Sequence, residues 1–176
     1  MIKLKKIFST NWSKQKISIL GAGKSGIGAA KLAQHIGASV FISDASYSLE
    51  LEKHVKSFDS ELGGHSNRVI DADLLILSPG IPESIPIVKS FIKMGGLVIS
   101  EIEFASWFTK DPIIAITGSN GKTTTIHLLH NMFQIAGFNT LIGGNVGIPF
   151  SKNVLSQIHK PTDNTVHILE LSSFQL

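Results

Sequence analysis

The segment from Ile113 to Thr125, IIAITGSNGKTTT, constrains the fold more than any other part of this sequence. Its apolar start is typical of a buried strand, and a loop with two glycines, a lysine and three threonines follows before a helical pattern begins. This order of strand, glycine-rich turn and helix is typical of a phosphate-binding loop, because glycines let backbone N–H groups approach phosphates and the helix N-terminus adds positive charge. The segment therefore predicts an α/β protein that binds a nucleotide.

The loop differs from the common pattern G-x-x-x-x-G-K-[ST]. Ile116 stands at the first glycine position, and the glycine falls two residues later, at Gly118. Lys122 can reach the β- and γ-phosphates of a nucleotide, and the hydroxyl of Thr123 is placed to hold Mg²⁺. The alternative is a chance Gly-Lys-Thr sequence in a surface turn, which the agreement of strand, loop and helix disfavours.

An earlier glycine-rich segment predicts a second nucleotide-like site. Residues 17–20 are apolar and meet Gly21 to Gly26, a G-x-G-x-x-G sequence, after which a helical pattern and a strand ending at Asp44 follow. In dinucleotide-binding folds an acid about 20 residues beyond the glycines contacts a ribose hydroxyl. We therefore expect a Rossmann-like parallel sheet here, with a tight turn that binds no ligand as the alternative.

Two further strand ends carry candidate site residues. Residues 74–77 are strongly apolar and end in the rigid turn Ser78 to Pro82, and ligands of open α/β sheets bind outside such carboxyl ends. Residues 166–169 lead to Glu170. An acid at the end of a strand beside a phosphate loop is the usual second anchor of nucleotide-bound Mg²⁺, directly or through water. The alternatives are a plain loop and a solvated acid.

A polar, proline-containing segment at residues 109–112 marks the expected domain boundary. Residues 1–110 are expected to form a Rossmann-like domain, and residues 111–176 the beginning of a P-loop ATPase domain. The predicted fold class is therefore α/β, with a parallel sheet in each part.

The composition indicates a globular chain of 176 residues, with 43% hydrophobic and 16% charged residues. Cysteine is absent, which excludes disulfides and thiolate metal sites.

The net charge of +3 arises from five lysines in the first sixteen residues, so a broad nucleic-acid-binding face is not expected. Since no apolar stretch has the length of a membrane span or signal peptide, we expect a cytoplasmic protein. The seven histidines lack metal-ligand spacing, and His65 is expected in an exposed loop.

Four segments together resemble the Mur ligases of bacterial cell-wall synthesis: GAGKSGIGAAKL, LSPGIP, ITGSNGKTTT, and GGNVG followed by ELSSFQL. The phosphate loop with a threonine before its first glycine is general to that family and its folate-ligating relatives. The SPGIP and ELSSFQL sequences are closer to the members that add D-glutamate. The resemblance implies a three-domain ligase, monomeric at full length. This chain would hold the first domain and the opening of the second, and would be inactive by itself.

The resemblance also implies ligands and site residues. The cofactors would be ATP and Mg²⁺, and the substrates UDP-N-acetylmuramoyl-L-alanine and D-glutamate, joined through an acyl phosphate. Lys122 and Glu170 would be catalytic, and Thr123 and Glu170 would bind the metal. The residues expected at ATP are Gly118, Ser119, Asn120, Gly121, Lys122, Thr123 and Thr124. Those expected at the UDP substrate are Gly23, Lys24, Ser25, Gly26, Asp44, Ser78, Pro79, Gly80, Asn145 and Ser172, with Asp44 facing the uracil ring.

Two other functions remain open from the sequence. A nicotinamide-dependent oxidoreductase would use the Gly21 loop, with Asp44 on the ribose, but would leave the Gly118 loop without a role. A non-catalytic nucleotide-binding module would use both loops without chemistry.

Overall fold

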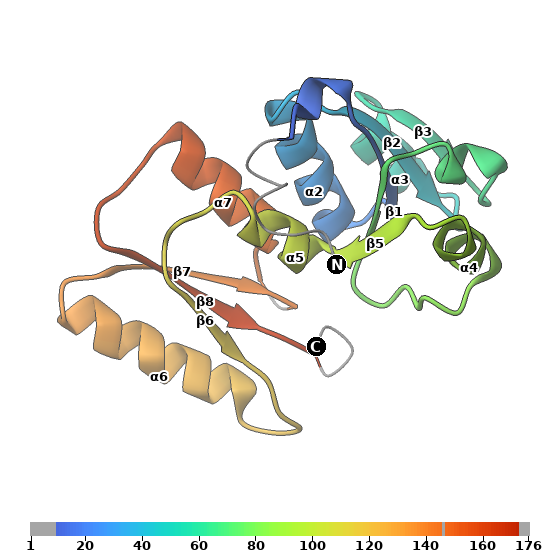
Figure 1. Ribbon diagram of the computed structural model, residues 1–176. Coiled ribbons are helices and arrows are strands. Elements are labelled where there is room, and N and C mark those ends of the chain that lie inside the picture. Colours follow the sequence, from blue (N-terminus) through green and yellow to red (C-terminus); the bar gives the residue numbers. More distant parts are fainter. Residues whose placement is uncertain (1–9, 146, 173–176) are drawn as a thin grey trace.

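The computed structural model describes residues 10–145 and 147–172, and these form two parallel sheets (Figure 1). The first sheet has the strand order β3-β2-β1-β4-β5, and the second has the order β6-β8-β7. This confirms the predicted α/β class. The strands are β1 Lys16–Leu20, β2 Ser39–Asp44, β3 Asp59–Leu62, β4 Leu74–Leu77, β5 Leu97–Ser100, β6 Ile113–Ile116, β7 Asn139–Gly144 and β8 Thr165–Glu170. The helices are α2 Lys24–His35, α3 Leu49–Val55, α4 Pro86–Lys93, α5 Glu101–Ser106, α6 Lys122–Ile135 and α7 Phe150–His159, with 3₁₀ turns η1 Trp12–Lys14 and η2 Asn67–Ile70.

The first sheet is covered on both faces, as its apolar strands require. Alternate residues of β1 enter different clusters: Ile17 and Ile19 pack with residues of α2 and α5, whereas Leu20 packs with residues of α4 and η2. All of its strand pairs are parallel, so the carboxyl ends of β1, β2 and β4 meet at one edge. The three turns that carry the Gly21, Asp44 and Ser78 residues therefore lie together at that edge.

The strand β3 was not predicted from the sequence. Its residues, Asp59–Leu62, include two acids and a serine and give no apolar pattern. The strand pairs in parallel with β2 at the edge of the sheet, where side chains on one side can remain in water.

The second sheet is less well covered than the sequence suggested. The strand β6 was expected to be buried, but Ile113 is 39% exposed and Ala115 is also exposed, because β6 is an edge strand of a small sheet. On α6, Ile126 is buried and packs with Val166 and Ile168 of β8. The opposite face of α6 is exposed at its apolar residues Leu128, Met132 and Ile135.

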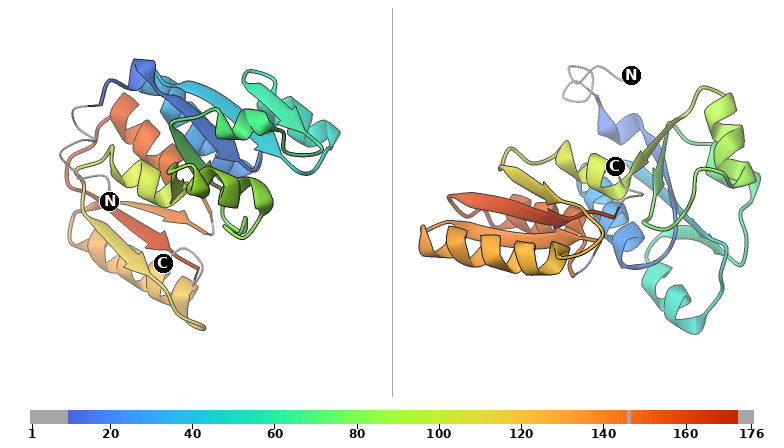
Figure 2. Two further views of the ribbon diagram at one scale, coloured as in Figure 1. Left: turned by 45° about the vertical axis from the view of Figure 1, so that its right-hand side comes forward. Right: turned by 90° about the horizontal axis from the view of Figure 1, so that it is seen from below.

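The helix α7 joins the two parts of the chain. It precedes β8 in sequence but packs against α2 and α5, between the two sheets (Figures 1 and 2). Phe150 and Val154 of α7 are fully buried in the same apolar cluster as Ala29 of α2. A Cβ on Gly28 would lie 2.5 Å from Ser151 Oγ, so only glycine allows this approach of α2 to α7. Because one core continues across both parts, the boundary at residues 110 and 111 stays a prediction.

No helix in the described ranges is long and apolar enough to cross a membrane.

Candidate functional site

The phosphate-type loop is open and ends in an uncapped helix. Gly121 precedes α6 with φ 77°, in the left-handed region that favours glycine, and Gly118 has φ 144°. No side chain caps the first turn of α6, and that turn contains no acid, so its N–H donors face outward with the positive end of the helix. The ammonium of Lys122 lies over the loop and donates to the carbonyl of Gly118 at 2.6 Å. This arrangement fits a bound phosphate group.

The carboxylate of Glu170 lies beside this loop. Ile116 of β6 and Glu170 of β8 are register partners, and the next residue, Leu171, donates its N–H to the carbonyl of Ile116 at 2.9 Å. The hydroxyl of Thr123 donates to Glu170 Oε2 at 3.1 Å. Glu170 is 5% exposed. A hydroxyl and a carboxylate held together beside a phosphate seat are the hard oxygen ligands that Mg²⁺ takes, so the residues present fit that ion.

The loop after β7 reaches the same edge. The N–H of Asn145 donates to the carbonyl of Glu170 at 2.8 Å, which places Asn145 next to the proposed metal ligands. Gly144 has φ 105°, and a Cβ there would collide with the carbonyl oxygen of Glu170. Ser172 follows two residues after Glu170 and is half-buried. The family resemblance implies that Asn145 and Ser172 bind the UDP substrate, and that assignment stays a prediction.

A cavity of about 420 Å³ lies at the carboxyl edge of the first sheet. It brings together half of the residues predicted for the UDP substrate: Gly23, Asp44, Ser78, Pro79 and Gly80. Its walls also include residues that the sequence did not single out as ligands: Gly21, Ala45, Ser46, His65, Ile81, Pro82 and Ile85. A mixed polar and apolar lining of this size is typical of a small-molecule site.

His65 corrects one expectation. It was expected in an exposed loop, but it is half-buried and its Nδ1 lies 2.7 Å from the hydroxyl of Ser43. The parallel strand β3 returns the chain to this edge, and the turn at Gly63 donates two N–H groups to the carbonyl of Asp44. Since the sequence did not predict β3, it could not predict the position of His65 beside the cavity either.

Asp44 holds the glycine-rich turn in place. Its Oδ2 accepts from the N–H of Ala22 at 2.7 Å, and its Oδ1 accepts from the N–H of Ser46 at 2.8 Å. Each carboxylate oxygen has a second lone pair, so a ligand donor can still approach. Gly26 is buried against the carbonyl of Gly21, where any side chain would collide, so its position also serves packing. Gly23, in contrast, has open space at its Cα.

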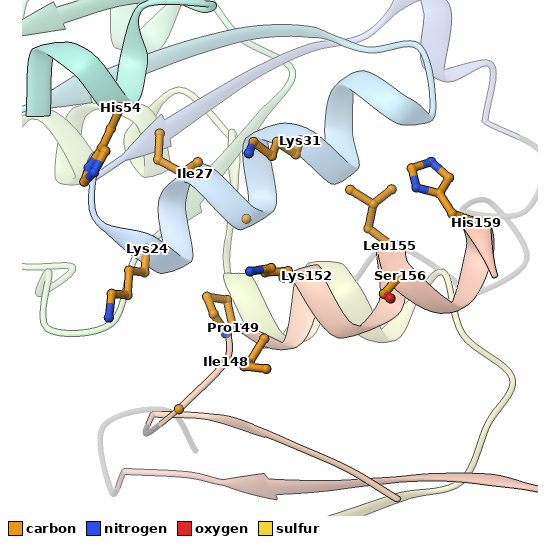
Figure 3. Close-up of a pocket in the computed structure, with 12 residues that line it drawn as sticks. Lys24, Ile27, Lys31, His54, Ile148, Pro149, Lys152, Leu155, Ser156 and His159 are labelled. Atoms are coloured by element: carbon orange, nitrogen blue, oxygen red, sulfur yellow. The ribbon is translucent and has the colours of Figure 1, made fainter. Parts of the chain in front are cut away.

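Lys24 does not line this cavity, although its neighbour Gly23 does. It lines a different cleft, between α2 and α7 (Figure 3). Ser25 is half-buried at the start of α2 and lines neither space. A role of Lys24 and Ser25 at a diphosphate therefore stays a prediction.

Comparison with known proteins gives two family matches. A family described as the MurD N-terminal domain matches residues 16–85, and one described as the Mur ligase middle domain matches residues 116–176. The UDP-N-acetylmuramoylalanine–D-glutamate ligase of Christiangramia forsetii is 42% identical over 167 residues, which cover 92% of this chain and 36% of that ligase. The ligase of the same name from Chlorobaculum tepidum is 44% identical over 166 residues, covering 90% and 35%.

Solved structures give the same picture of the fold. A murein peptide ligase from Psychrobacter arcticus superposes with a TM-score of 0.57 at 20% identity, covering 91% of this chain and 38% of that protein. A pseudomurein peptide ligase type C from Methanothermus fervidus superposes with a TM-score of 0.51 at 26% identity, covering 93% and 34%. The chain spans about a third of the length of the curated relatives it matches.

Proposed function

The chain belongs to the Mur ligase family, and from this premise we propose that it contributes the UDP-substrate site and the phosphate loop of an ATP-dependent ligase that adds D-glutamate to UDP-N-acetylmuramoyl-L-alanine. The observation that carries the proposal is the meeting of Lys122, Thr123 and Glu170 at one sheet edge. The curated relatives with this name support the choice of substrates.

At the ATP end, the loop of residues 118–124 is proposed to bind the triphosphate. In this structure the ammonium of Lys122 donates to a carbonyl of its own loop. When ATP is bound, the same ammonium could donate to the transferring phosphoryl group instead. The free N–H groups of the first turn of α6 would add donors there. These groups stabilise charge that develops when the substrate carboxylate attacks the γ-phosphate, which gives an acyl phosphate and ADP. The amine of D-glutamate would then displace phosphate to form the amide.

The residues that would hold Mg²⁺ are Thr123, through its hydroxyl, and Glu170, through its carboxylate or a water. When bound, the ion would supply positive charge that stabilises the phosphates. The burial of Glu170 between β6 and β7 fixes its position, since its backbone is paired on both sides.

At the other end, the cavity beside Asp44 is proposed to bind the uridine part of the substrate. Asp44 would accept from the uracil ring with its remaining lone pairs, and the turn at Ser78 to Gly80 would lie against the nucleotide. Asn145, whose N–H donates to the carbonyl of Glu170, would contact the sugar part. We place the ligase in the bacterial cytoplasm, where ATP is available, and propose that the full-length protein acts as a monomer.

Titration calorimetry tests this assignment against the oxidoreductase alternative. We expect the chain to bind MgATP and the UDP-linked substrate, with no affinity for NADH. Lys122→Ala should abolish MgATP binding and leave UDP-substrate binding unchanged. The same variant in a full-length ligase should form no acyl phosphate in a single turnover. Binding of NADH in the Asp44 cavity, or normal turnover of the Lys122→Ala ligase, would contradict the proposal.

A further inference from the structure

A second cleft lies between the two parts of the chain; it shares no lining residue with the cavity beside Asp44 or with the phosphate loop, although Lys24, predicted at the UDP diphosphate, is one of its walls. It has a volume of about 580 Å³, within the range of small-molecule sites. Its walls come from α2, α3, α7 and the segment just before α7 (Figure 3). The lining residues are Lys24, Ile27, Gly28, Lys31, His54, Gly147, Ile148, Pro149, Lys152, Leu155, Ser156 and His159.

The charged lining of this cleft is entirely basic. It includes Lys24, Lys31 and Lys152 and contains no carboxylate. None of these three lysines forms an ion pair within the described ranges. The ion pairs there are formed by Lys16, Arg68 and His167 instead. Figure 3 shows Lys31 on α2 and Lys152 on α7, with both ammonium groups directed toward the side where Lys24 and His54 lie. Like charges gathered without an acid favour an anion between them.

The helix ends add to this positive potential. Lys24 and Lys152 lie in the first turns of α2 and α7, where the helix dipole is positive and where acids are usual. Neither first turn contains an acid. The carboxylate of Glu101 does reach the N-terminus of α7, accepting from the N–H of Ser151 at 2.6 Å, but it is buried and does not line the cleft.

Part of the remaining lining is apolar, beside the polar side chains of His54, Ser156 and His159. Ile27, Ile148 and Leu155 give the cleft a hydrophobic wall next to its cations. The contact of Gly28 with α7 and the burial of Phe150 fix the two helices against each other, so the cleft is formed before any ligand arrives. An anion beside an apolar surface suits a phosphate group that carries an organic part.

We propose that this cleft binds a phosphate-bearing small molecule, held by Lys31 and Lys152 across the contact between α2 and α7. The proposal goes beyond the ligase function and does not depend on it. Because the ligand would bridge the two parts of the chain, it would also stabilise their contact.

The test uses inorganic pyrophosphate as the probe, in the Lys122→Ala protein, so that the phosphate loop does not contribute. Binding is measured by calorimetry, and its location by backbone amide shifts in nuclear magnetic resonance. We expect shifts at residues of α2 and α7 around Lys31 and Lys152. The double variant Lys31→Gln/Lys152→Gln should bind about tenfold more weakly, a difference of about 1.4 kcal/mol.

The matched control is Lys89→Gln/Lys93→Gln on α4, which removes the same charge from exposed positions outside the cleft. It should bind pyrophosphate like the parent. Equal weakening in both double variants would reveal unspecific charge attraction and overturn the proposal, as would unchanged binding in Lys31→Gln/Lys152→Gln. Competition by UDP at the same amides would assign the cleft to the nucleotide substrate and also overturn it. Failure of the ligase proposal would instead appear as absent MgATP and UDP-substrate binding in the unmodified chain.

Discussion

The hydroxyl of Thr123 and the carboxylate of Glu170 are hydrogen-bonded at 3.1 Å, although the two residues are 47 positions apart in sequence. Thr123 lies in the first turn of α6, which follows β6, and Glu170 ends β8, the strand that pairs with β6. The parallel register of β6 and β8 therefore creates this pair, and it carries the proposed metal site.

Loss of either partner should reduce the magnesium dependence of ATP binding. In Thr123→Val and Glu170→Gln, we expect the ratio of ATP affinities with and without Mg²⁺ to fall about tenfold, because one oxygen ligand is lost. Thr123→Ser keeps the hydroxyl and should behave like the unmodified chain. Calorimetric titrations with ATP in the presence of magnesium or of a chelator give the ratio. An unchanged ratio in Thr123→Val would place the ion elsewhere.

Gly144 should tolerate no side chain. Gly144→Ala would meet both a left-handed backbone and the carbonyl of Glu170, so we expect a loss of about 3 kcal/mol or more in the free energy of unfolding. Gly137 has φ 85°, and a methyl group added there would meet no heavy atom within 4 Å, so Gly137→Ala should lose about 1–2 kcal/mol from backbone strain alone. Urea unfolding of both variants measures the difference. Equal losses would show that the contact with Glu170 can relax.

The sequence predicted the parts of the fold that have strong local patterns. The strands β1, β4 and β8 are apolar runs bounded by turns, and glycines with positive φ follow β1 and β4, at Gly21 and Gly80. Thr123 was predicted as a metal ligand from its position after Lys122 in the phosphate loop, and Glu170 from its position at the end of a strand neighbouring that loop. Neither prediction needs knowledge of side-chain packing.

The sequence could not predict which elements pack against each other when they are distant along the chain. The polar strand β3 has no apolar pattern, and its position beside β2 depends on contacts distant in sequence. The packing of α7 on α2 depends on the fit of Gly28 against Ser151, which helical periodicity does not reveal. The sequence therefore did not predict that the side chain of Lys24, which the resemblance assigned to the UDP diphosphate, would line a cleft with α7.

Buried His167 should make the protein less stable in acid. Burial lowers the pKa of His167 below its ordinary value of 6.5, and Asp111, 3.5 Å away, opposes this only in part. A lowered pKa contributes stability that is present above pH 6.5 and lost as the pH falls through the folded-state value. His167→Asn should lose this component of the pH dependence, whereas His127→Asn on exposed α6 should retain it. Urea unfolding between pH 8 and pH 5 provides the comparison, and parallel curves for His167→Asn and the unmodified chain would contradict it.

Buried Glu101, in contrast to His167, should make the protein less stable as the pH rises. Burial raises its pKa above the ordinary value of 4.5, and hydrogen bonding from Ser151 opposes the rise in part. A raised pKa contributes stability that is full below pH 4.5 and is lost as the pH rises through the folded-state value. Glu101→Gln keeps an oxygen for the N–H of Ser151 but cannot ionise, so its stability relative to the unmodified chain should increase from acid to neutral pH. Glu83→Gln, at an exposed position, should show no such trend.

Because Glu101 joins α5 to the first turn of α7, the stabilised variant Glu101→Gln should also slow amide exchange at Ser151 at neutral pH. Faster exchange there would mean that the ionised carboxylate, rather than the neutral one, holds the two parts of the chain together.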